Sequence, residues 1–385
     1  MPSLERVGMV AGEASGDLLA AALLAAMRAR WPQVRAQGVG GHAMQAQGFE
    51  AWSDSEALAV RGYVEVLPKL IPLLRLRKRL GDRWLAQRPD VFVGVDAPDF
   101  NFDLERRLRQ AGVPTVHFVS PSFWAWRPEK VLKLREAADH VLCLFPFEPA
   151  LLAEHGVAAT YVGHPLASVI PQQVDRPAAK QALGLQPDVP VVALLPGSRA
   201  AEIEHLADRF VQAARLVQAE HGRPVQFVMP AVPSQHARLA ALLAAQGAQD
   251  QVRLLHGQSH AALAACDVTL IASGTATLEA ALFGCPMVIA YAMPALSHWL
   301  MRRKQLMPWV GLPNILCQQA VVPELLQDQA TPQALARAVL QWLHSPAEVA
   351  ALRQRLARLH TELAQDTPTL ACDAIANVVA ARSGA

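Results

Sequence analysis

Residues 191–220 read VVALLPGSRAAEIEHLADRFVQAARLVQAE and contain an apolar run, a glycine turn and a helical pattern in direct succession. The run Val191–Leu195 is continuously apolar, as is typical of a parallel β-strand that is buried on both faces. Residues 202–220 follow the helical spacing of apolar positions. A strand followed by a helix in this way, repeated along a chain, predicts an α/β fold with parallel sheets.

The same unit recurs on both sides of this stretch. Helical patterns over residues 18–30, 104–110 and 278–283 fall between further apolar runs. The segment Ala167–Lys180 lacks a clean period and carries two prolines, so it is interpreted as a linker. The predicted strands are Val7–Ala11, Ala36–Val39, Val91–Val95, Thr115–Val119, His140–Leu144, Thr160–Val162, Val191–Leu195, Val225–Met229, Val252–Leu255, Val268–Ala272 and Met287–Tyr291.

This pattern predicts two Rossmann-like, doubly wound domains that face a cleft, where folds of this class bind their ligands. We expect a first domain over residues 1–168 and a second over residues 169–345. Residues 346–385 are purely helical in pattern and are expected to pack back on the first domain or on a partner subunit. Exposed apolar surface and this tail are compatible with a homodimer.

The composition narrows the class of protein. Of 385 residues, 52% are hydrophobic and 18% charged, which excludes disorder. Lys and Arg total 35 against 33 Asp and Glu, so nothing points to a nucleic-acid partner. No apolar run reaches the ~18 residues of a spanning helix, and acidic residues precede the apolar stretch 18–27, unlike a signal peptide. We therefore expect a cytoplasmic protein.

The five cysteines lie far apart and form no CxxC pair. Neither a thiolate zinc site nor a disulfide framework is expected, and reduced, buried thiols are the ordinary interpretation.

The first of four turns at strand ends is GEASGD, residues 12–17. It lacks the GxGxxG pattern, and the next strand ends in GVGG without an acidic residue for a ribose, so a nicotinamide cofactor is disfavoured. Two interpretations stay open: a purely structural turn, or a turn whose backbone N–H groups face a substrate.

The second turn is LLPGSR, residues 194–199. Gly197 allows close backbone approach, Ser198 is a candidate N-cap, and Arg199 puts a permanent cation at a helix start, which together suit an anion. An ordinary cap with a solvated arginine is the alternative.

The third turn is SGTATLEA, residues 273–280. Small residues and hydroxyls at a helix start favour phosphate. Glu279 does not follow a Ser or Thr by three residues, so it completes no capping box and is a candidate for a ribose diol; a solvent-facing glutamate is the alternative. Two such helix starts in one domain suit a diphosphate.

The fourth turn lies in VGVDAPDFN, residues 93–101. Asp96 directly follows a buried strand, and Pro98 disfavours helix at Ala97, so Asp96 should stay at the strand end as a candidate general base. Asp99 is its rival but is expected to cap the next helix. Caps and turns alone would also explain both residues.

An aromatic motif and a lone histidine complete the first half. In SPSFWAWR, residues 120–127, the side chains of Phe123, Trp124 and Trp126 suit stacking on a sugar or packing on acyl chains, with core packing as the alternative. His164 is a candidate hinge or cleft residue.

Residues Val64–Trp84 form a basic and apolar segment. Leu67, Leu70, Ile71 and Leu74 have helical spacing, and six Lys or Arg accompany two acidic residues. Pro68 and Pro72 would fit at a helix start or kink. The pattern favours contact with a membrane surface, but a core-facing helix with a solvated basic face has the same period.

The motifs GEASGD, DAPDFN, SPSFWAWR, LLPGSR, SGTATLE and LPN (residues 312–314) occur in this order. Together they resemble the lipid-A-disaccharide synthases, inverting glycosyltransferases of lipid A assembly, from Gly12 to at least Asn314. Each motif alone is weak, whereas all of them in order are highly specific.

The resemblance implies a glycosyltransferase-B fold and a reaction without metal or cofactor. UDP-2,3-diacylglucosamine would glycosylate the 6-hydroxyl of 2,3-diacylglucosamine 1-phosphate and release UDP. The protein would lie at the cytoplasmic leaflet of the inner membrane, which it would contact through Val64–Trp84.

The resemblance also implies roles for single residues. Asp96 matches the family's proposed base, and Asn314 matches an important asparagine for which the residues suggest no role. The second domain would bind UDP, with Glu279 on the ribose. The other expected substrate-binding residues are Glu13, Ser15, Gly16, Arg199, Ser273, Gly274, Thr275, Ala276 and Thr277.

Two other functions remain open on the sequence. A UDP-N-acetylglucosamine 2-epimerase would share the fold and nucleotide site but would need no membrane segment. A binding module would hold a UDP-sugar without turnover.

Overall fold

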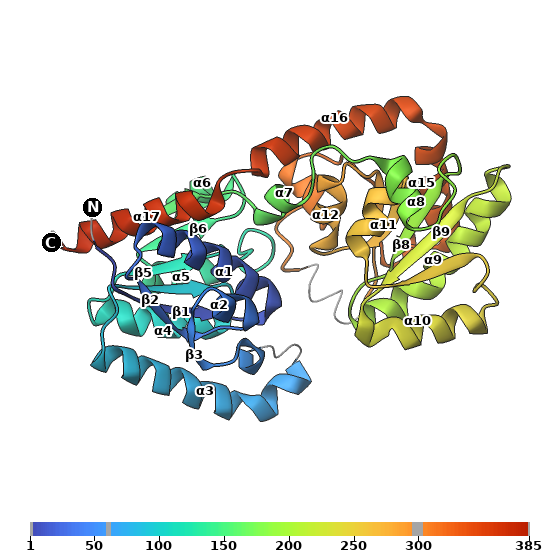
Figure 1. Cartoon of the computed structure of the whole chain (residues 1–385). Helices are drawn as coiled ribbons and strands as arrows, with labels where there is room; N and C mark the ends of the chain where they lie inside the picture. Colours follow the sequence, from blue (N-terminus) through green and yellow to red (C-terminus); the bar gives the residue numbers. More distant parts are fainter. Residues whose placement is uncertain (1–2, 59–62, 295–302, 384–385) are drawn as a thin grey trace. The chain divides into compact units, whose positions relative to one another are not determined.

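The chain divides into two compact units in the computed structural model, which describes residues 3–58, 63–294 and 303–383 (Figure 1). Unit 1 is Met1–Pro165 together with Leu363–Ala385, and unit 2 is Leu166–Glu362. The division falls slightly before the expected boundary at residues 168/169. No described helix has the length and apolar character to cross a membrane.

Unit 1 is built on a parallel sheet of seven strands in the order β3-β2-β1-β4-β5-β6-β7. The strands are β1 Arg6–Ala11, β2 Arg35–Val39, β3 Glu50–Ser53, β4 Val91–Val95, β5 Thr115–Phe118, β6 His140–Cys143 and β7 Ala159–Tyr161. Six of them were predicted. Only β3 was missed, because this edge strand is partly exposed and has no apolar run.

Unit 2 has a parallel sheet of six strands in the order β10-β9-β8-β11-β12-β13. The strands are β8 Val191–Leu195, β9 Gln226–Ala231, β10 Val252–His256, β11 Val268–Ala272, β12 Met287–Tyr291 and β13 Glu324–Leu326. In both sheets the strand order reverses beside the first strand, which is the doubly wound arrangement. The predicted fold class is confirmed.

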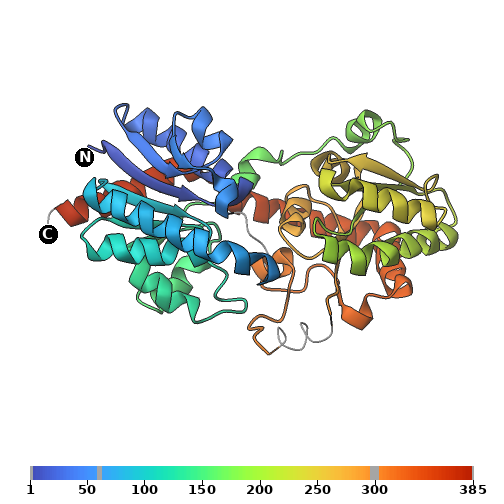
Figure 2. The same ribbon diagram turned by 90° about the horizontal axis from the view of Figure 1, so that it is seen from below.

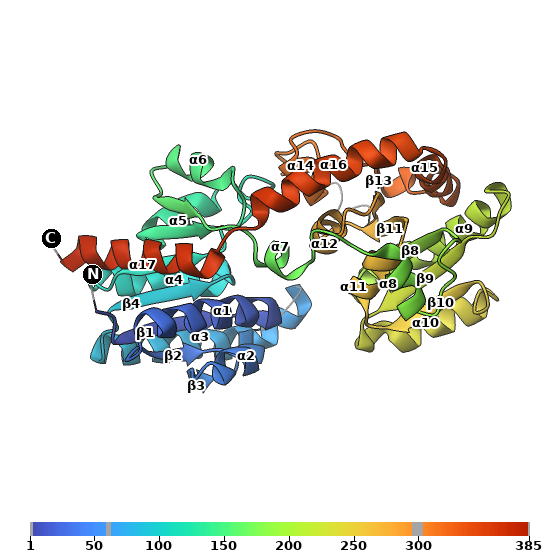
Figure 3. The same cartoon turned by 45° about the horizontal axis from the view of Figure 1, so that its top comes forward.

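Helices alternate with the strands along the chain, and α15, α16 and α17 follow the last strand (Figures 1 and 3). Those of unit 1 are α1 Glu13–Arg30, α2 His42–Ala46, α3 Tyr63–Ala86, α4 Pro98–Gln110, α5 Lys130–Ala137, α6 Glu148–Ala153 and α17 Thr367–Ser383. From α7 to α16 they are α7 Pro165–Val169, α8 Arg176–Ala182, α9 Ala200–Glu220, α10 Pro233–Ala245, α11 Ser259–Ala265, α12 Ala276–Leu282, α14 Leu312–Leu316, α15 Pro332–His344 and α16 Pro346–Leu363.

Both faces of the sheet of unit 1 are covered by helices. Helices α1 and α17 pack side by side over one face, where Met27 and Ile375 are fully buried (Figure 3). Helices α3 and α4 cover the other face, where Trp84 packs edge-on against Phe92 at 4.9 Å between ring centroids (Figure 2). Helix α17, with seventeen residues, thus completes the core of unit 1, whose other elements come from residues 1–165.

The helical tail is shared between the units. Helix α16 belongs to unit 2 up to Glu362, and the chain from Leu363 onward, including α17, belongs to unit 1. The expected tail over residues 346–385 is therefore two segments with different partners.

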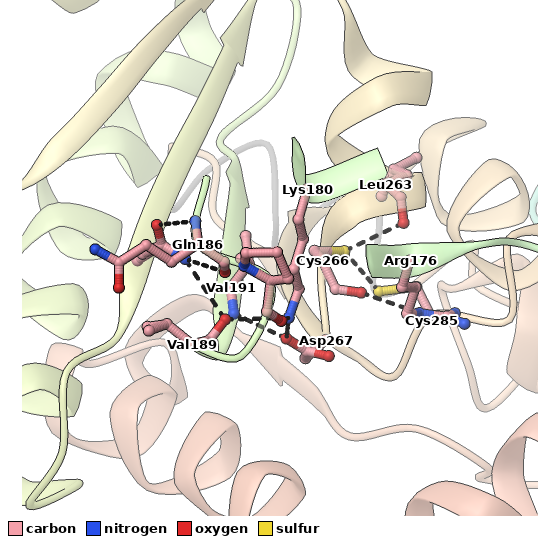
Figure 4. A network of polar contacts seen from close by, with 11 residues as sticks. Arg176, Lys180, Gln186, Val189, Val191, Leu263, Cys266, Asp267 and Cys285 are labelled. Carbon is pink, nitrogen blue, oxygen red and sulfur yellow. Dashed lines mark hydrogen bonds and ion pairs between the residues drawn. The ribbon is translucent and has the colours of Figure 1, made fainter. Parts of the chain in front are cut away.

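The expected linker is largely helical, because it contains α7 and α8. Figure 4 shows Arg176 and Lys180 of α8 beside Cys266 and Asp267, where the Arg176 Nε donates to the Cys266 carbonyl at 3.3 Å. The Arg176 guanidinium donates to the carbonyls of Phe283 at 2.8 Å and Gly284 at 3.1 Å. The Lys180 ammonium is buried and pairs with Asp267 at 2.8 Å. Polar contacts of this kind hold α8 in place, which is why the segment is helical although it has no clean apolar period.

Candidate functional site

The GEASGD and DAPDFN turns (residues 12–17 and 96–101) lie together in unit 1. They follow β1 and β4, the neighbouring strands at which the strand order reverses. A Cβ built on Gly12 would lie 3.0 Å from the Ala97 Cβ, so the two turns are packed directly against each other. The carboxyl ends of strands at such a switch point are the usual ligand site of doubly wound sheets.

Asp96 is fixed at this edge by its backbone. Its N–H donates to the Phe118 carbonyl at 2.8 Å, and its carbonyl accepts from the Asn101 amide at 2.8 Å. Asp96 and Ala97 both have positive φ, of 52° and 44°, which non-glycine residues rarely adopt. The half-buried Asp96 carboxylate makes no hydrogen bond or ion pair with any described residue.

Asp99 is placed differently from what we expected. The helix begins at Pro98 with Ala97 as its N-cap, and no side chain caps it. Asp99 lies in the first turn, exposed, with its carboxylate 3.2 Å from the Lys130 ammonium. The predicted capping role is wrong because Pro98 takes the first helical position, so Asp99 lies inside the helix, past the N-cap residue Ala97.

In the GEASGD turn the helix α1 begins directly at Glu13, so Ser15 and Gly16 are helical. Ser15 is exposed, whereas Gly16 is buried against the Val95 carbonyl. The buried Asp17 was not singled out from the sequence. Its carboxylate accepts from the N–H groups of Gly41 at 2.7 Å and Ala43 at 2.8 Å, which ties the GVGG turn to α1.

A buried polar cluster lies behind the DAPDFN turn. The Glu105 carboxylate is 2.8 Å from the His117 Nδ1, and both side chains are fully buried. Burial raises the pKa of Glu105, and the adjacent His117 opposes this shift. A Cβ on Gly94 would meet both Glu105 and Asn101, so the glycine leaves room for the cluster. Nothing in the sequence predicts this cluster, because Glu105 lies in a helical pattern and His117 in a strand pattern that give no sign of their contact.

The corresponding turns of unit 2 are the GSR turn (residues 197–199) after β8 and the SGTAT turn (residues 273–277) after β11. These strands are again neighbours where the strand order reverses. The residues predicted to bind a diphosphate are therefore brought to one edge of one sheet.

In the GSR turn the backbone N–H groups and Arg199 are bound by a carboxylate of the protein itself, that of Glu202. Arg199, not Ser198, is the N-cap of α9, which corrects the prediction. The Glu202 carboxylate accepts from the N–H groups of Ser198 at 3.0 Å and Arg199 at 3.2 Å, and it pairs with the Arg199 guanidinium at 2.7 Å. A side chain on Gly197 would collide with Glu202. The Arg199 side chain is nevertheless 62% exposed.

The hydroxyls of the SGTAT turn are largely used within the protein. Ser273 Oγ donates to the Val310 carbonyl at 3.1 Å, and Thr277 Oγ1 donates to the Gly274 carbonyl at 2.7 Å. Gly274 and Thr275 are exposed. The Glu279 carboxylate lies 3.5 Å from the His260 Nε2, which is its partner in this structure.

Asn314 is completely buried and its amide is fully used. Its Nδ2 donates to the Val322 carbonyl at 2.9 Å and to Glu324 at 2.7 Å. Its Oδ1 accepts from the N–H groups of Val321 at 2.7 Å and Val322 at 2.9 Å. Asn314 thus organises a loop, and Glu324, which the sequence analysis missed, is its partner.

In the aromatic motif, Phe123 and Trp124 are buried, as the core-packing alternative predicts, and Trp126 is exposed. Trp124 Nε1 donates at 3.1 Å to Glu148, a buried carboxyl. His164 is also buried, which lowers its pKa to about 4. Among the described residues, no group of three or more His, Cys, Asp or Glu is placed to hold a metal ion.

Glu148 makes the stability of unit 1 depend on pH. Burial raises the pKa of Glu148 to about 8, above an ordinary value of 4.5. The folded chain therefore binds this proton more tightly, so the stabilisation is complete below about pH 4.5 and is lost as pH rises through 8. We expect the unfolding free energy to fall about 1 kcal/mol per pH unit in this window relative to Glu148→Gln. Urea unfolding of the wild type and of Glu148→Gln at pH 5 to 8 measures this difference. If the two unfolding free energies change with pH in parallel, Glu148 is not the group responsible.

The chain matches a known protein family over most of its length. A model of the lipid-A-disaccharide synthetase family matches residues 7–377. The lipid-A-disaccharide synthase of Albidiferax ferrireducens is 59% identical over 379 residues, which are 97% of this chain and 97% of that protein.

Two solved structures show the fold. The calicheamicin glycosyltransferase superposes with a TM-score of 0.60 at 15% identity, over 99% of both chains. The UDP-GlcNAc 2-epimerase of Neisseria meningitidis, bound to UDP-GlcNAc, has a TM-score of 0.59 at 11% identity, over 93% of this chain and 99% of that one. At such identities the likeness extends to the fold alone, so it does not favour the epimerase alternative.

The fold is thus that of glycosyltransferase-B enzymes, as the resemblance implied. With a family model over residues 7–377 and a relative 59% identical across nearly its whole length, the chain belongs to the lipid-A-disaccharide synthetase family of hexosyltransferases.

Proposed function

We propose that this chain transfers a 2,3-diacylglucosaminyl group from UDP to the 6-hydroxyl of 2,3-diacylglucosamine 1-phosphate, with inversion at the sugar carbon. The acceptor oxygen forms the new bond to C1, the bond from C1 to the diphosphate oxygen breaks, and UDP leaves. The observation that carries the proposal is the pairing of motif turns at both switch points: a carboxylate in unit 1 and an arginine with a small-residue turn in unit 2.

In unit 1, Asp96 takes the proton of the acceptor hydroxyl. The proposal is supported by two backbone hydrogen bonds, which hold Asp96 at the ligand edge of the sheet, and by a carboxylate that has no partner among the described residues. One such base contributes about 10²–10⁴-fold to the rate. The neighbouring residues Glu13 and Ser15 contact the acceptor in this proposal, because their turn packs against that of Asp96, while the buried Gly16 lets α1 approach the end of β4.

In unit 2, the diphosphate binds at the GSR and SGTAT turns and Glu279 holds the ribose. Arg199 is exposed enough to exchange Glu202 for a phosphate. The exposed backbone of Gly274 and Thr275, with Ala276, provides N–H groups toward the same charge. Fixed donors of this kind stabilise charge that develops on the leaving UDP, which is work that a metal ion does elsewhere.

We further propose that α3 contacts the cytoplasmic leaflet of the inner membrane. Leu70, Ile71 and Leu74 of α3 are 43%, 59% and 44% exposed, so they do not face the core. The core face of α3 consists instead of Leu76, Leu80 and Trp84.

The exposed face of α3 is also basic. At 3.6 residues per turn, Arg75, Lys78 and Arg79 lie on the same side as the exposed apolar residues, and all three are exposed. An apolar patch beside cations suits an anionic lipid surface, to which each cation adds about 1 kcal/mol. The side chains of residues 63–69, where Leu67 and Pro68 belong, lie outside the described residues.

Replacing Leu70 and Leu74 together by serine should weaken binding to vesicles that contain anionic phospholipid. The melting temperature should stay near that of the wild type, because both side chains are exposed. Co-sedimentation measures the binding. Leu132→Ser, an exposed leucine on α5, is the matched control and should change neither quantity. Unchanged sedimentation of the double variant would contradict the membrane proposal.

The reaction itself is tested by UDP release from UDP-2,3-diacylglucosamine in EDTA, with and without the 1-phosphate acceptor. We expect release only with the acceptor, together with a disaccharide product. Release without acceptor, or a change in the sugar's configuration, would favour the epimerase. Binding of UDP without release in either case would favour a binding module.

Light scattering during size-exclusion chromatography tests the homodimer.

A further inference from the structure

The segment that precedes β13, residues 310–323, is tied together by the carboxylate of Glu324. Glu324, the first residue of β13, accepts hydrogen bonds from three N–H groups: Val310 at 2.9 Å, Gly311 at 3.0 Å and the Asn314 side chain at 2.7 Å. Both carboxylate oxygens are used, one for Val310 and the other for Gly311 and Asn314. Glu324 is therefore the centre of a hydrogen-bond cluster at the start of β13.

Asn314 extends this centre across the segment. Its amide links Glu324 to the backbone of Val321 and Val322, so the short helix α14 is closed onto the start of β13. Asn314 is completely buried, and each of its polar atoms has a partner within the chain. This residue acts on its surroundings through Glu324 and the backbone.

A hydrogen bond of Val310 joins this segment to the SGTAT turn. The Val310 carbonyl accepts from Ser273 Oγ at 3.1 Å, while the Val310 N–H is held by Glu324 at 2.9 Å. The next residue is glycine, and a Cβ there would collide with Ile289 of β12, so this part of the backbone is pressed onto the sheet. The Ser273 N–H is bonded in turn to the Ala290 carbonyl at 3.0 Å.

From these contacts we propose that Glu324 is a positioning residue for the SGTAT turn. It acts through Val310 on Ser273 and so sets the N–H groups that face the nucleotide diphosphate. The inference rests on the proposed function of this turn. A carboxylate is required because all three of its partners donate; the amide of a glutamine would turn an N–H₂ group toward one of them.

The test compares Glu324→Gln, Ser273→Ala and the double variant by UDP titration calorimetry and by steady-state kinetics. We expect Glu324→Gln to weaken UDP binding about tenfold and to raise KM for the UDP-sugar, with kcat changed far less. Ser273→Ala breaks the same link, so the double variant should bind UDP about as weakly as the worse single variant. Glu204→Gln, an exposed carboxyl on α9, is the matched control.

The outcomes separate the two levels of the argument. Near-wild-type UDP binding by Glu324→Gln, with Ser273→Ala impaired, overturns the positioning role and leaves the proposed function standing. Additive losses of UDP affinity in the double variant also overturn the positioning role, because they would show that Glu324 and Ser273 act independently and not through Val310. A wild-type chain that does not bind UDP contradicts the proposed function and the inference with it.

A purely structural role is distinguished by a milder change. Glu324→Asp keeps the charge and shortens the side chain by one methylene, so the fold should persist if Glu324→Gln does not fold. We expect a melting temperature near that of the wild type and an intermediate UDP affinity. Wild-type affinity in this variant would overturn the proposal.

Discussion

Replacing Asp96 by asparagine should lower turnover about 10²–10⁴-fold, the usual contribution of a general base. The asparagine is nearly the same size and keeps the backbone clamp to Phe118 and Asn101, but it cannot accept the acceptor proton. The affinity for UDP and the melting temperature should stay near wild type, because Asp96 lies in unit 1 and its carboxylate has no partner among the described residues.

Asp99→Asn is the matched control for this experiment. Asp99 is three residues away, exposed and paired with Lys130, so its loss should leave turnover within about twofold. Kinetics of acceptor-dependent UDP release, with titration of UDP on each variant, measure both effects. Full turnover by Asp96→Asn would remove Asp96 from the chemistry, and a large loss in Asp99→Asn instead would transfer the role of base to that residue.

The largest effect on stability is expected from His117→Ala. His117 and Glu105 are both fully buried, and the substitution leaves Glu105 without its ring partner and opens a cavity under β5. Breaking a buried pair from one side costs about 3–5 kcal/mol. The unfolding free energy of unit 1 should fall by this amount, as measured by urea denaturation followed by tryptophan fluorescence.

The double variant Glu105→Leu with His117→Phe controls for the loss of the pair itself. Replacing both members by apolar residues of similar size removes the stranded carboxyl, so most of the lost stability should return. Equal destabilisation by the single and double variants would show that packing, and not the unpaired Glu105, sets the cost.

The sequence sufficed for the fold because burial on both faces leaves a direct signal. Eleven apolar runs correspond to strands, and the two strands that were missed, β3 and β13, are short strands at the edges of their sheets. Edge strands pack on one side only, so their residues need not be apolar. The segment taken as a linker was helical because Arg176 and Lys180 anchor it through carbonyls and a carboxylate.

The candidate site could be located from sequence but not worked out. Strand ends and glycine turns indicate where a ligand site lies, and Asp96 is where its strand predicts. Sequence cannot show that Glu202 occupies the turn beside Arg199, because this depends on a rotamer of one side chain. It could not separate Leu70 and Leu74 from Leu76 and Leu80 either, since both sets have the same helical period.

The packing of α17 on α1 has a consequence for how the protein is made. Residues 1–165 are translated before unit 2, but α17, the helix that covers their apolar face, is translated only after it. At 5–20 residues per second, synthesis of the intervening unit takes about 10–40 s. During that time Met27 and its neighbours on α1 lack the helix that covers them in the folded chain, so this apolar face stays exposed or is shielded by a chaperone until α17 has been synthesised.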